Sequence, residues 1–342
     1  MSSSHTVFVT AASGHIGQEL VPLLLKTTTH KVILPTSSAA KLDAQIASLG
    51  LASDVASRAV IVEGDIKDPV WVQEQCQTHG VDTAFLCLTG SDELFTTCTI
   101  LEAFKAARIK HLVYLSAWFE QSNTVAGMSG TLDMWGIVAH GLVKVAIELI
   151  LPTLPFTHTV LGPTLFTTND LRAKPALVVP NDAPGAAAFV PRAQPRLIEP
   201  LGNIGASRVF PYDIACAAVR CIDDAGERYN KRKIVIGTLK SYNKAEMERV
   251  WTAAFRAALG GSSDVSVTMA ECDAATLDRL EELLRAAIGP GWAKELRVMY
   301  DAIAEYGWGP NETQYAEQVE LLGREPMDYE AWVHETARSW LV

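Results

Sequence analysis

The sequence predicts an α/β protein with a doubly wound parallel sheet and a smaller, mostly helical C-terminal lobe. Two observations carry this prediction. Short β-branched runs alternate with helical apolar periods over residues 1–165, and from residue 243 onward the pattern is mostly helical. Close alternation of strands and helices favours parallel strands joined by right-handed crossovers.

The first part of the chain contains six predicted strands. Each is a short apolar run rich in β-branched residues, and they cover 6–10, 31–36, 59–66, 82–90, 110–118 and 156–166. Helical spacing predicts helices over 16–26, 94–109 and 136–152, and a further strand is expected at 232–237. We therefore divide the chain into a first domain, 1–165, and a lobe, 166–342, whose elements partly interleave with that domain.

Composition narrows the class of protein. The chain has 342 residues, 49% of them hydrophobic, with a net charge of −10 and no long Lys/Arg run, so a nucleic-acid partner is not expected. It has no 18-residue apolar run and no signal-peptide pattern, which predicts a cytoplasmic protein without a membrane partner. No HExxH or GxSxG motif and no CxxC pair occurs, so no metal site is expected.

The stretch VTAASGHIG, residues 9–17, resembles a phosphate-binding loop that lacks its first glycine. Such a loop places a pyrophosphate on a helix N-terminus, where free amides and the helix dipole favour negative charge. Gly14 and Gly17 occupy the later two glycine positions of such a loop, and Ala11 occupies the first. If residue 11 needs a positive φ, alanine costs roughly 1–2 kcal/mol; if φ is negative, the methyl costs little.

We expect this loop to bind a dinucleotide, although an ordinary strand-to-helix turn is the alternative. Ser13 is expected to cap the helix or to contact a phosphate. The predicted cofactor contacts in the loop are Thr10, Ala11, Ser13, Gly14, His15, Ile16 and Gly17.

The end of the second strand favours NADP(H) over NAD(H). An NAD site usually has an acid there, but this chain has no acid between residue 31 and Asp43. Hydroxyl groups and one charge are available for a 2′-phosphate, from Thr36, Ser37, Ser38 and Lys41. A helix cap and its first turn would explain the same residues. Asp65, after the third strand, is expected at the adenine or at the start of a turn.

Seven stretches occur in the order found in a known family: TAASGHIG, GDIKDP, HLVYLSAW, HGLVKVAIE, VLGPTLFTTND, VFPYDIACAAV and LLGREPMDYEAWVHETA. Together they resemble the NmrA-like branch of the atypical short-chain dehydrogenases/reductases. The resemblance implies a Rossmann domain, a smaller C-terminal lobe and a preference for NADP(H). It leaves function open, because members include NADPH-dependent reductases, redox-sensing regulators, and fungal proteins of natural-product (secondary) metabolism, some of which only shape a cyclisation.

The predicted helix 136–152 should carry the catalytic residues. Ordinary short-chain reductases have Tyr-x-x-x-Lys, whose spacing puts both side chains on one helix face. Here Lys144 is present, His140 stands in the tyrosine position, and residues 115–211 contain no tyrosine. We expect Lys144 to hold the nicotinamide ribose, and Lys144 or His140 to exchange a proton. We expect the Lys144 charge to keep the His140 ring neutral. The alternatives are a surface lysine and a packing histidine.

Two further groups of residues are expected near the nicotinamide. Ser116, at the end of the fifth strand, could orient a substrate carbonyl or cap the strand, and Gly162, Pro163 and Thr164 would offer backbone groups. Aromatic and apolar side chains predict an apolar, aromatic or polycyclic substrate, although packing in the core would explain many of them. The predicted substrate contacts are Trp118, Phe119, Met134, Trp135 and Phe166.

The hypothesis from the sequence is an NADPH-dependent reductase of a C=C, C=N or C=O bond in an apolar small molecule. One alternative is a non-redox cyclase in which bound NADP(H) forms part of the pocket wall and is not consumed. A sensor of NADP(H) that docks a protein partner is the other.

Overall fold

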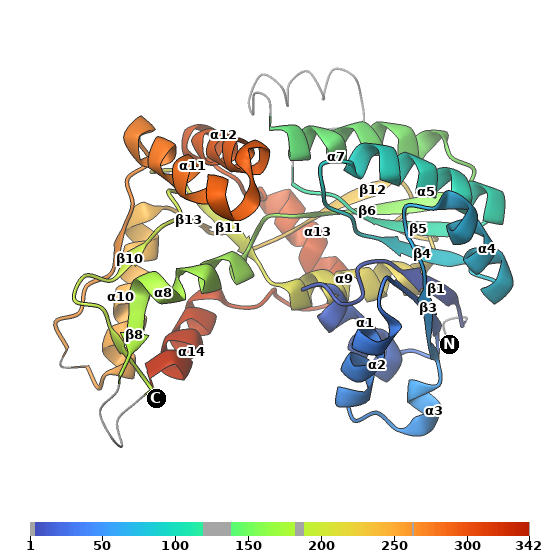
Figure 1. The fold of residues 1–342 in the computed structure, drawn as a ribbon, viewed down its shortest axis with the longest axis horizontal. Helices are drawn as coiled ribbons and strands as arrows, with labels where there is room; N and C mark the ends of the chain where they lie inside the picture. The colour runs from blue at the N-terminus through green and yellow to red at the C-terminus, as the bar shows by residue number, and fades with distance from the viewer. Residues whose placement is uncertain (1–3, 119–137, 182–187, 262, 342) are drawn as a thin grey trace.

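The computed structural model describes residues 4–118, 138–181, 188–261 and 263–341. Its centre is a seven-stranded parallel sheet in the order β12-β6-β5-β4-β1-β2-β3 (Figure 1). The strands are β1 (Thr6–Val9), β2 (Lys31–Thr36), β3 (Ala59–Glu63), β4 (Thr83–Leu86), β5 (His111–Leu115), β6 (Thr157–Pro163) and β12 (Arg232–Ile236). The prediction of a doubly wound α/β fold is confirmed.

Helices cover both faces of the sheet, as alternation along the strands requires. On β1, Val7 and Val9 pack into one apolar cluster and Phe8 packs into another on the opposite face. The first face carries α1 (Gly17–Thr27), α2 (Ala39–Ser48), α9 (Pro211–Asp224) and α13 (Glu312–Leu322). The second carries α4 (Pro69–His79), α5 (Glu93–Ala107) and α7 (Ala139–Ile150) (Figure 1).

The later part of the chain returns to the first domain. β12 pairs with β6 along the edge of the central sheet, and α9 packs in the same apolar cluster as α1. Leu321 and Leu322 of α13 complete that cluster. The sheet therefore uses residues from both sides of position 165.

The C-terminal lobe is mostly helical. Its elements are β7 (Leu165–Phe166), α8 (Lys174–Leu177), β8 (Val178–Pro180), β9 (Phe189–Pro191), β10 (Arg196–Leu197), β11 (Ala206–Val209), β13 (Ser241–Tyr242), α10 (Lys244–Ala258), β14 (Thr268–Met269), α11 (Ala274–Ile288), α12 (Pro290–Tyr306) and α14 (Tyr329–Leu341). Its core centres on the fully buried Trp251, which stacks on Trp340 at 5.5 Å between ring centroids. Gly289 separates α11 from α12.

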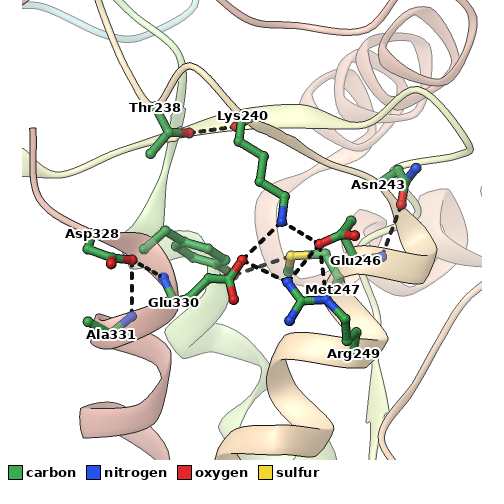
Figure 2. A network of polar contacts seen from close by, with 10 residues as sticks. Thr238, Lys240, Asn243, Glu246, Met247, Arg249, Asp328, Glu330 and Ala331 are labelled. Carbon is green, nitrogen blue, oxygen red and sulfur yellow. Dashed lines mark hydrogen bonds and ion pairs between the residues drawn. The ribbon is translucent and has the colours of Figure 1, made fainter.

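Ion pairs on the surface of the lobe join α10 to α14, as Figure 2 shows. Lys240 lies 2.6 Å from Glu246 and 3.0 Å from Glu330, and Arg249 bonds the same two carboxylates at 2.8 and 2.7 Å. These groups are largely in contact with solvent, so each pair stabilises the lobe by at most about 1 kcal/mol. Among the described helices, none has the length and apolar character needed to cross a bilayer.

Candidate active site

A cleft of about 430 Å³ opens at the carboxyl ends of four neighbouring strands. Residues 10–13 follow β1, residues 35–37 end β2, residues 64–66 follow β3 and residues 87–89 follow β4, and all of these line the cleft. Strand order reverses between β1 and β4, so this is the crevice where open α/β sheets bind ligands. The predicted phosphate loop therefore lines a cleft at the position where such sheets bind ligands.

Ala11 adopts a left-handed backbone with φ of +54°. The first position of the loop thus needs the conformation that glycine adopts freely, and Ala11 carries the cost of roughly 1–2 kcal/mol. The loop keeps its turn nevertheless, because the amide of Gly14 donates to the Ala11 carbonyl at 2.9 Å.

Gly17 is the position where only glycine fits. A Cβ there would lie 2.3 Å from the Ala11 carbonyl oxygen and 2.4 Å from that of Ala12, both backbone atoms. At Gly14 the nearest atom would be 3.2 Å away, which is far milder. The close approach brings the start of α1 directly under the loop.

The other loop residues divide into backbone and side-chain contributors. Ser13 and His15 are exposed, whereas the Ile16 side chain is buried in the core, so only its backbone is available to a ligand. In the described ranges, no backbone carbonyl accepts the amides of Ser13, His15 or Ile16. Such free amides before a helix suit an anion.

One expectation for this loop needs correction, and Thr10 has an additional structural role. Ser13 does not cap α1, whose N-terminus has no side-chain cap. The Thr10 hydroxyl is buried and bonds the end of β4: it accepts the Cys87 amide at 2.7 Å and donates to the Cys87 carbonyl at 3.1 Å. Thr10 therefore lines the cleft and also ties β1 to β4.

An acid that the sequence analysis did not single out lies beside the end of β2. The parallel register pairs Thr36 with Glu63, and a Glu63 carboxylate oxygen accepts the Ala39 amide at 2.9 Å, at the start of α2. Thr36 and Ser37 line the cleft, while Lys41 is exposed. Ser38 is the N-cap residue of α2, but its side chain makes no capping bond. The hydroxyl groups predicted for a 2′-phosphate thus share this corner with a carboxylate.

Asp65 starts a turn, as one of its two predicted roles requires. It lines the cleft, and its Oδ1 accepts the Lys67 amide at 2.9 Å in a tight turn. The turn holds the carboxylate in the lining of the cleft.

Lys144 is buried and lies directly behind the cleft. Its Nζ lies 2.5 Å from Glu93 Oε1 and donates to the carbonyl of Leu88, a cleft residue, at 3.0 Å. A longer bond of 3.4 Å reaches the Leu115 carbonyl. The alternative of a surface lysine is wrong, because only 7% of the residue is exposed.

Glu93 is the second acid that the sequence analysis missed. It is 3% exposed at the first turn of α5. Burial raises the pKa of the Glu93 carboxyl above its usual value, while the charge of Lys144 and its hydrogen bond act against that rise. The pair holds a cation close to the loop 87–89 that forms one wall of the cleft.

His140 faces the C-terminal lobe. Its Nδ1 lies 2.7 Å from Glu295 Oε1 of α12, and its backbone amide donates to the same oxygen at 2.9 Å. Trp292 lies 5.8 Å from the imidazole between ring centroids. The carboxylate beside the His140 ring is Glu295, and the Lys144 ammonium is paired with Glu93, so the expected effect of Lys144 on His140 stays a prediction.

A second pocket, of about 240 Å³, contains His140. It is lined by Gly90, Ser91, Ala139, His140, Val143, Gly291, Trp292 and Glu295. One loop joins it to the dinucleotide cleft, because residues 87–89 line the cleft and residues 90 and 91 line the pocket. The helix α7 lines the pocket with His140, and its Lys144 bonds the Leu88 carbonyl of the cleft wall.

Ser116 does not point into either cavity. It is 4% exposed, and its hydroxyl donates to Glu148, which also accepts Lys233 at 2.8 Å. The Ser116 hydroxyl is thus engaged inside the protein, which contradicts a role in orienting substrate. Glu148 forms an ion pair with Lys233 of β12.

Gly162 and Pro163 end β6, and Thr164 lies between β6 and β7. The Pro163 carbonyl accepts the Trp118 amide at 2.9 Å, and the Thr164 amide donates to the Ile236 carbonyl at 3.0 Å. The Thr164 side chain is buried and bonds Ser207 at 3.2 Å. The prediction of free backbone groups at Pro163 and Thr164 is therefore wrong, because β12 and residue 118 pair with them.

The predicted substrate aromatics have three outcomes. Trp118 is 7% exposed in the core of the C-terminal lobe, and its carbonyl accepts Trp308 Nε1 at 3.1 Å. Phe166 packs against the apolar cluster under α1 and α9. Trp118 is therefore a packing residue, which corrects that prediction, whereas Phe166 is only half-buried and its contact with substrate stays a prediction. Phe119, Met134 and Trp135 lie outside the described residues.

A family model described as NAD(P)H-binding matches residues 11–194, more than half of the chain. The match includes the loop, the cleft and α7, and the resemblance to the NmrA-like group is consistent with it. A search of curated proteins found no significant match.

Solved structures of similar fold align over nearly the whole chain. An NADPH-dependent quinone oxidoreductase from Escherichia coli, complexed with NADPH, has a TM-score of 0.72 and 16% identity, covering 98% of this chain and 99% of its own. A triphenylmethane reductase from Citrobacter, complexed with NADP(H), gives 0.70 and 16%, with 97% and 99% covered. A nucleoside-diphosphate-sugar epimerase from Staphylococcus aureus gives 0.70 and 13%, with 96% and 99% covered. These two reductases and this epimerase therefore share the fold of this chain.

Proposed function

Because this chain belongs to the NAD(P)H-binding family, we propose that it is an NADPH-dependent reductase of an apolar small molecule. The observation that carries the proposal is the continuity of two cavities. The dinucleotide cleft and the pocket of His140 are lined by consecutive residues, 87–89 and 90–91, of one loop. A cofactor and a substrate could therefore meet at the start of α7.

The cleft residues fit a dinucleotide. The amides of Ser13, His15 and Ile16 would hold the pyrophosphate, and Asp65 would meet the adenine end. Thr36, Ser37 and Ser38, with Lys41, would surround a 2′-phosphate. When bound, NADPH supplies a hydride to the substrate.

Lys144 is assigned to binding the cofactor ribose, and His140 is assigned to proton transfer. Lys144 places a positive charge behind the cleft wall and fixes the Leu88 carbonyl, which favours the ribose end of the cofactor there. His140 is the titratable side chain that lines the second pocket together with Glu295. It would give a proton to the substrate atom next to the reduced carbon.

The lining of the second pocket favours an apolar, aromatic substrate. Val143 and Trp292 form its apolar walls beside the His140 ring. Quinones and triphenylmethane dyes are the substrates named for two proteins of similar fold. Both contain conjugated six-membered rings with little charge, so they are suitable probe substrates.

A non-redox cyclase is the second candidate, and one observation favours it. Lys144 already bonds Glu93, Leu88 and Leu115, so its ammonium has protein partners without any cofactor. A cofactor that serves as a structural floor would suit such a lysine, and catalysis would then rest on positioning.

Consumption of NADPH separates the two candidates. The purified protein is incubated with NADPH and, in turn, a quinone and a triphenylmethane dye, and cofactor oxidation is followed together with product. The reductase oxidises one NADPH for each product molecule. Product formed with NADPH required but not consumed would contradict the reductase and favour the cyclase.

A further inference from the structure

The contact between His140 and Glu295 joins the two halves of the molecule. His140 lies in the first turn of α7, a helix that covers the central sheet. Glu295 lies on α12 of the C-terminal lobe. One oxygen of Glu295 accepts both the His140 backbone amide, at 2.9 Å, and the ring nitrogen Nδ1, at 2.7 Å. The side chains are 27% and 13% exposed, so the contact is partly shielded from water.

The charge of the Glu295 carboxylate determines which nitrogen of the His140 ring carries the proton. Burial acts to raise the pKa of the Glu295 carboxyl, but hydrogen bonds from the His140 ring and backbone and from the Ala139 backbone bring it below its usual value. An ionised carboxylate only accepts hydrogen bonds, so Nδ1 must carry the proton in this contact. Nε2 is then the ring nitrogen left for the pocket that His140 lines.

Other charged groups around the ring are already paired. A charge on His140 acts to lower the pKa of Glu93 on α5, but Glu93 forms an ion pair with Lys144 at 2.5 Å. The carboxylate that can compensate a positive charge on the imidazole is therefore Glu295. This arrangement matches the general rule that a catalytic base is oriented by a third group on its other side.

We propose that His140 and Glu295 form an acid–base dyad across the two lobes, in which Glu295 positions the ring and Nε2 exchanges a proton with the substrate. The proposal rests on the reductase function proposed above. In the reductive direction His140 starts as the imidazolium, with a proton on each ring nitrogen; the substrate carbon gains the hydride and the Nε2–H bond breaks. The proton goes to the neighbouring substrate oxygen or nitrogen, Nδ1–H stays bonded to Glu295, and solvent returns a proton to Nε2.

A purely structural role for Glu295 is the competing explanation. A carboxylate over the first amides of α7 caps that helix, because α7 has no capping side chain of its own. Capping needs only the backbone bond to His140. The bond to Nδ1 is the additional feature, and the test must address the ring.

The first experiment measures the tautomer of His140 without cofactor. Protein with ¹⁵N-labelled histidine is studied by NMR at a pH well above the titration range of histidine, and His140→Gln assigns the signal among the eight histidines. The wild type should hold its proton on Nδ1, and Glu295→Ala should revert toward the Nε2–H form. Glu305→Ala, an exposed acid on the same helix, should leave the wild-type signal unchanged. A wild-type ring protonated on Nε2 would overturn the dyad.

The second experiment uses turnover of NADPH with a quinone. Glu295→Gln keeps a carbonyl oxygen for the helix cap and should lower kcat roughly tenfold, while His140→Ala should lower it roughly 100-fold. The NADPH dissociation constant should stay unchanged in both. The double variant should be no slower than His140→Ala, because Glu295 acts through the ring.

Two results would separate the possible failures. If Glu295→Gln slows the enzyme further in the His140→Ala background, Glu295 does not act through the ring and the dyad is overturned. If the wild type binds NADPH and never consumes it while His140 still carries its proton on Nδ1, the reductase function fails and the geometry of the contact stands.

Discussion

Replacing Gly17 by alanine tests the phosphate loop by a single methyl group. The added Cβ would meet the carbonyl oxygens of Ala11 and Ala12 at 2.3 and 2.4 Å and a carbonyl carbon at 2.5 Å. All three are backbone atoms, so the loop or the helix must move by about 1 Å to reach ordinary contact. Overpacking of this kind costs roughly 1–3 kcal/mol, and the rigid partners place Gly17→Ala at the upper end.

The helical preference of alanine offsets part of that cost. Alanine is favoured over glycine in a helix by roughly 1 kcal/mol, so we expect a net loss of about 2 kcal/mol in the free energy of unfolding. For a chain of this size that corresponds to a fall in Tm on the order of 5 °C. Displacement of the loop should also weaken NADPH binding at least tenfold, because the amides no longer converge on the phosphates.

Gly291→Ala is the matched control. Gly291 also lies in the first turn of a helix, but a Cβ there would have no atom within 4 Å. Thermal unfolding followed by circular dichroism should show Gly291→Ala at or slightly above the wild-type Tm. If Gly17→Ala melts as high as Gly291→Ala, the close approach of loop and helix is not tight, and the reasoning is refuted.

Four further predictions follow from single side chains. Ala11→Gly relieves the left-handed strain of roughly 1–2 kcal/mol but loosens the unfolded chain, so Tm should rise by a degree or two; a clear fall would contradict the strained turn. Glu63→Gln removes the carboxylate at the start of α2 and should raise NADPH affinity several-fold relative to NADH in calorimetric titrations, and an unchanged ratio would place the 2′-phosphate elsewhere. Glu93→Gln leaves the buried Lys144 ammonium without its counter-charge and should cost about 3–5 kcal/mol in urea unfolding; a loss below about 1 kcal/mol would argue against the buried pair. The pKa of Glu295 is lowered on folding, so its contribution to stability is full above the usual carboxyl value of 4.5 and is lost as pH falls through the folded value. The unfolding free energies of wild type and Glu295→Gln should therefore converge in acid, and a constant difference would contradict the ionised contact.

Local patterns in the sequence predict the sheet and the loop well. The run 6–10 forms β1 in the structure, and the glycine spacing that follows predicts the turn into α1. The helix predicted over 136–152 is found at Ala139–Ile150, with Lys144 on its buried face. Such features depend on neighbours within a few residues, which periodicity and glycine spacing report directly.

The acids of the site could not be predicted in the same way. Glu63 meets the Ala39 amide because parallel pairing of β2 with β3 brings them together, and Glu295 meets His140 across 155 residues of chain. Glu93 meets Lys144 because α5 and α7 pack side by side. Neither periodicity nor motif spacing reports which elements become neighbours, so these three contacts become visible only in the fold.

The error at residues 162–164 has the same origin. The stretch GPT has the composition of a loop, yet β12 arrives from residues 232–236 and pairs with β6 up to Pro163. The backbone groups expected to meet a ligand are used by that pairing and by the amide of residue 118. A strand contributed from so far along the chain thus engages a segment in which the sequence analysis expected contacts to a ligand.

Calorimetric titration of the purified protein with NADPH, NADP⁺ and NADH tests the central claim most directly, since it needs no substrate. We predict one site for each chain, micromolar or tighter binding of the phosphorylated forms, and at least tenfold weaker binding of NADPH to Gly17→Ala. Failure of all three dinucleotides to bind the folded wild type would contradict the assignment of the cleft and, with it, the reductase function.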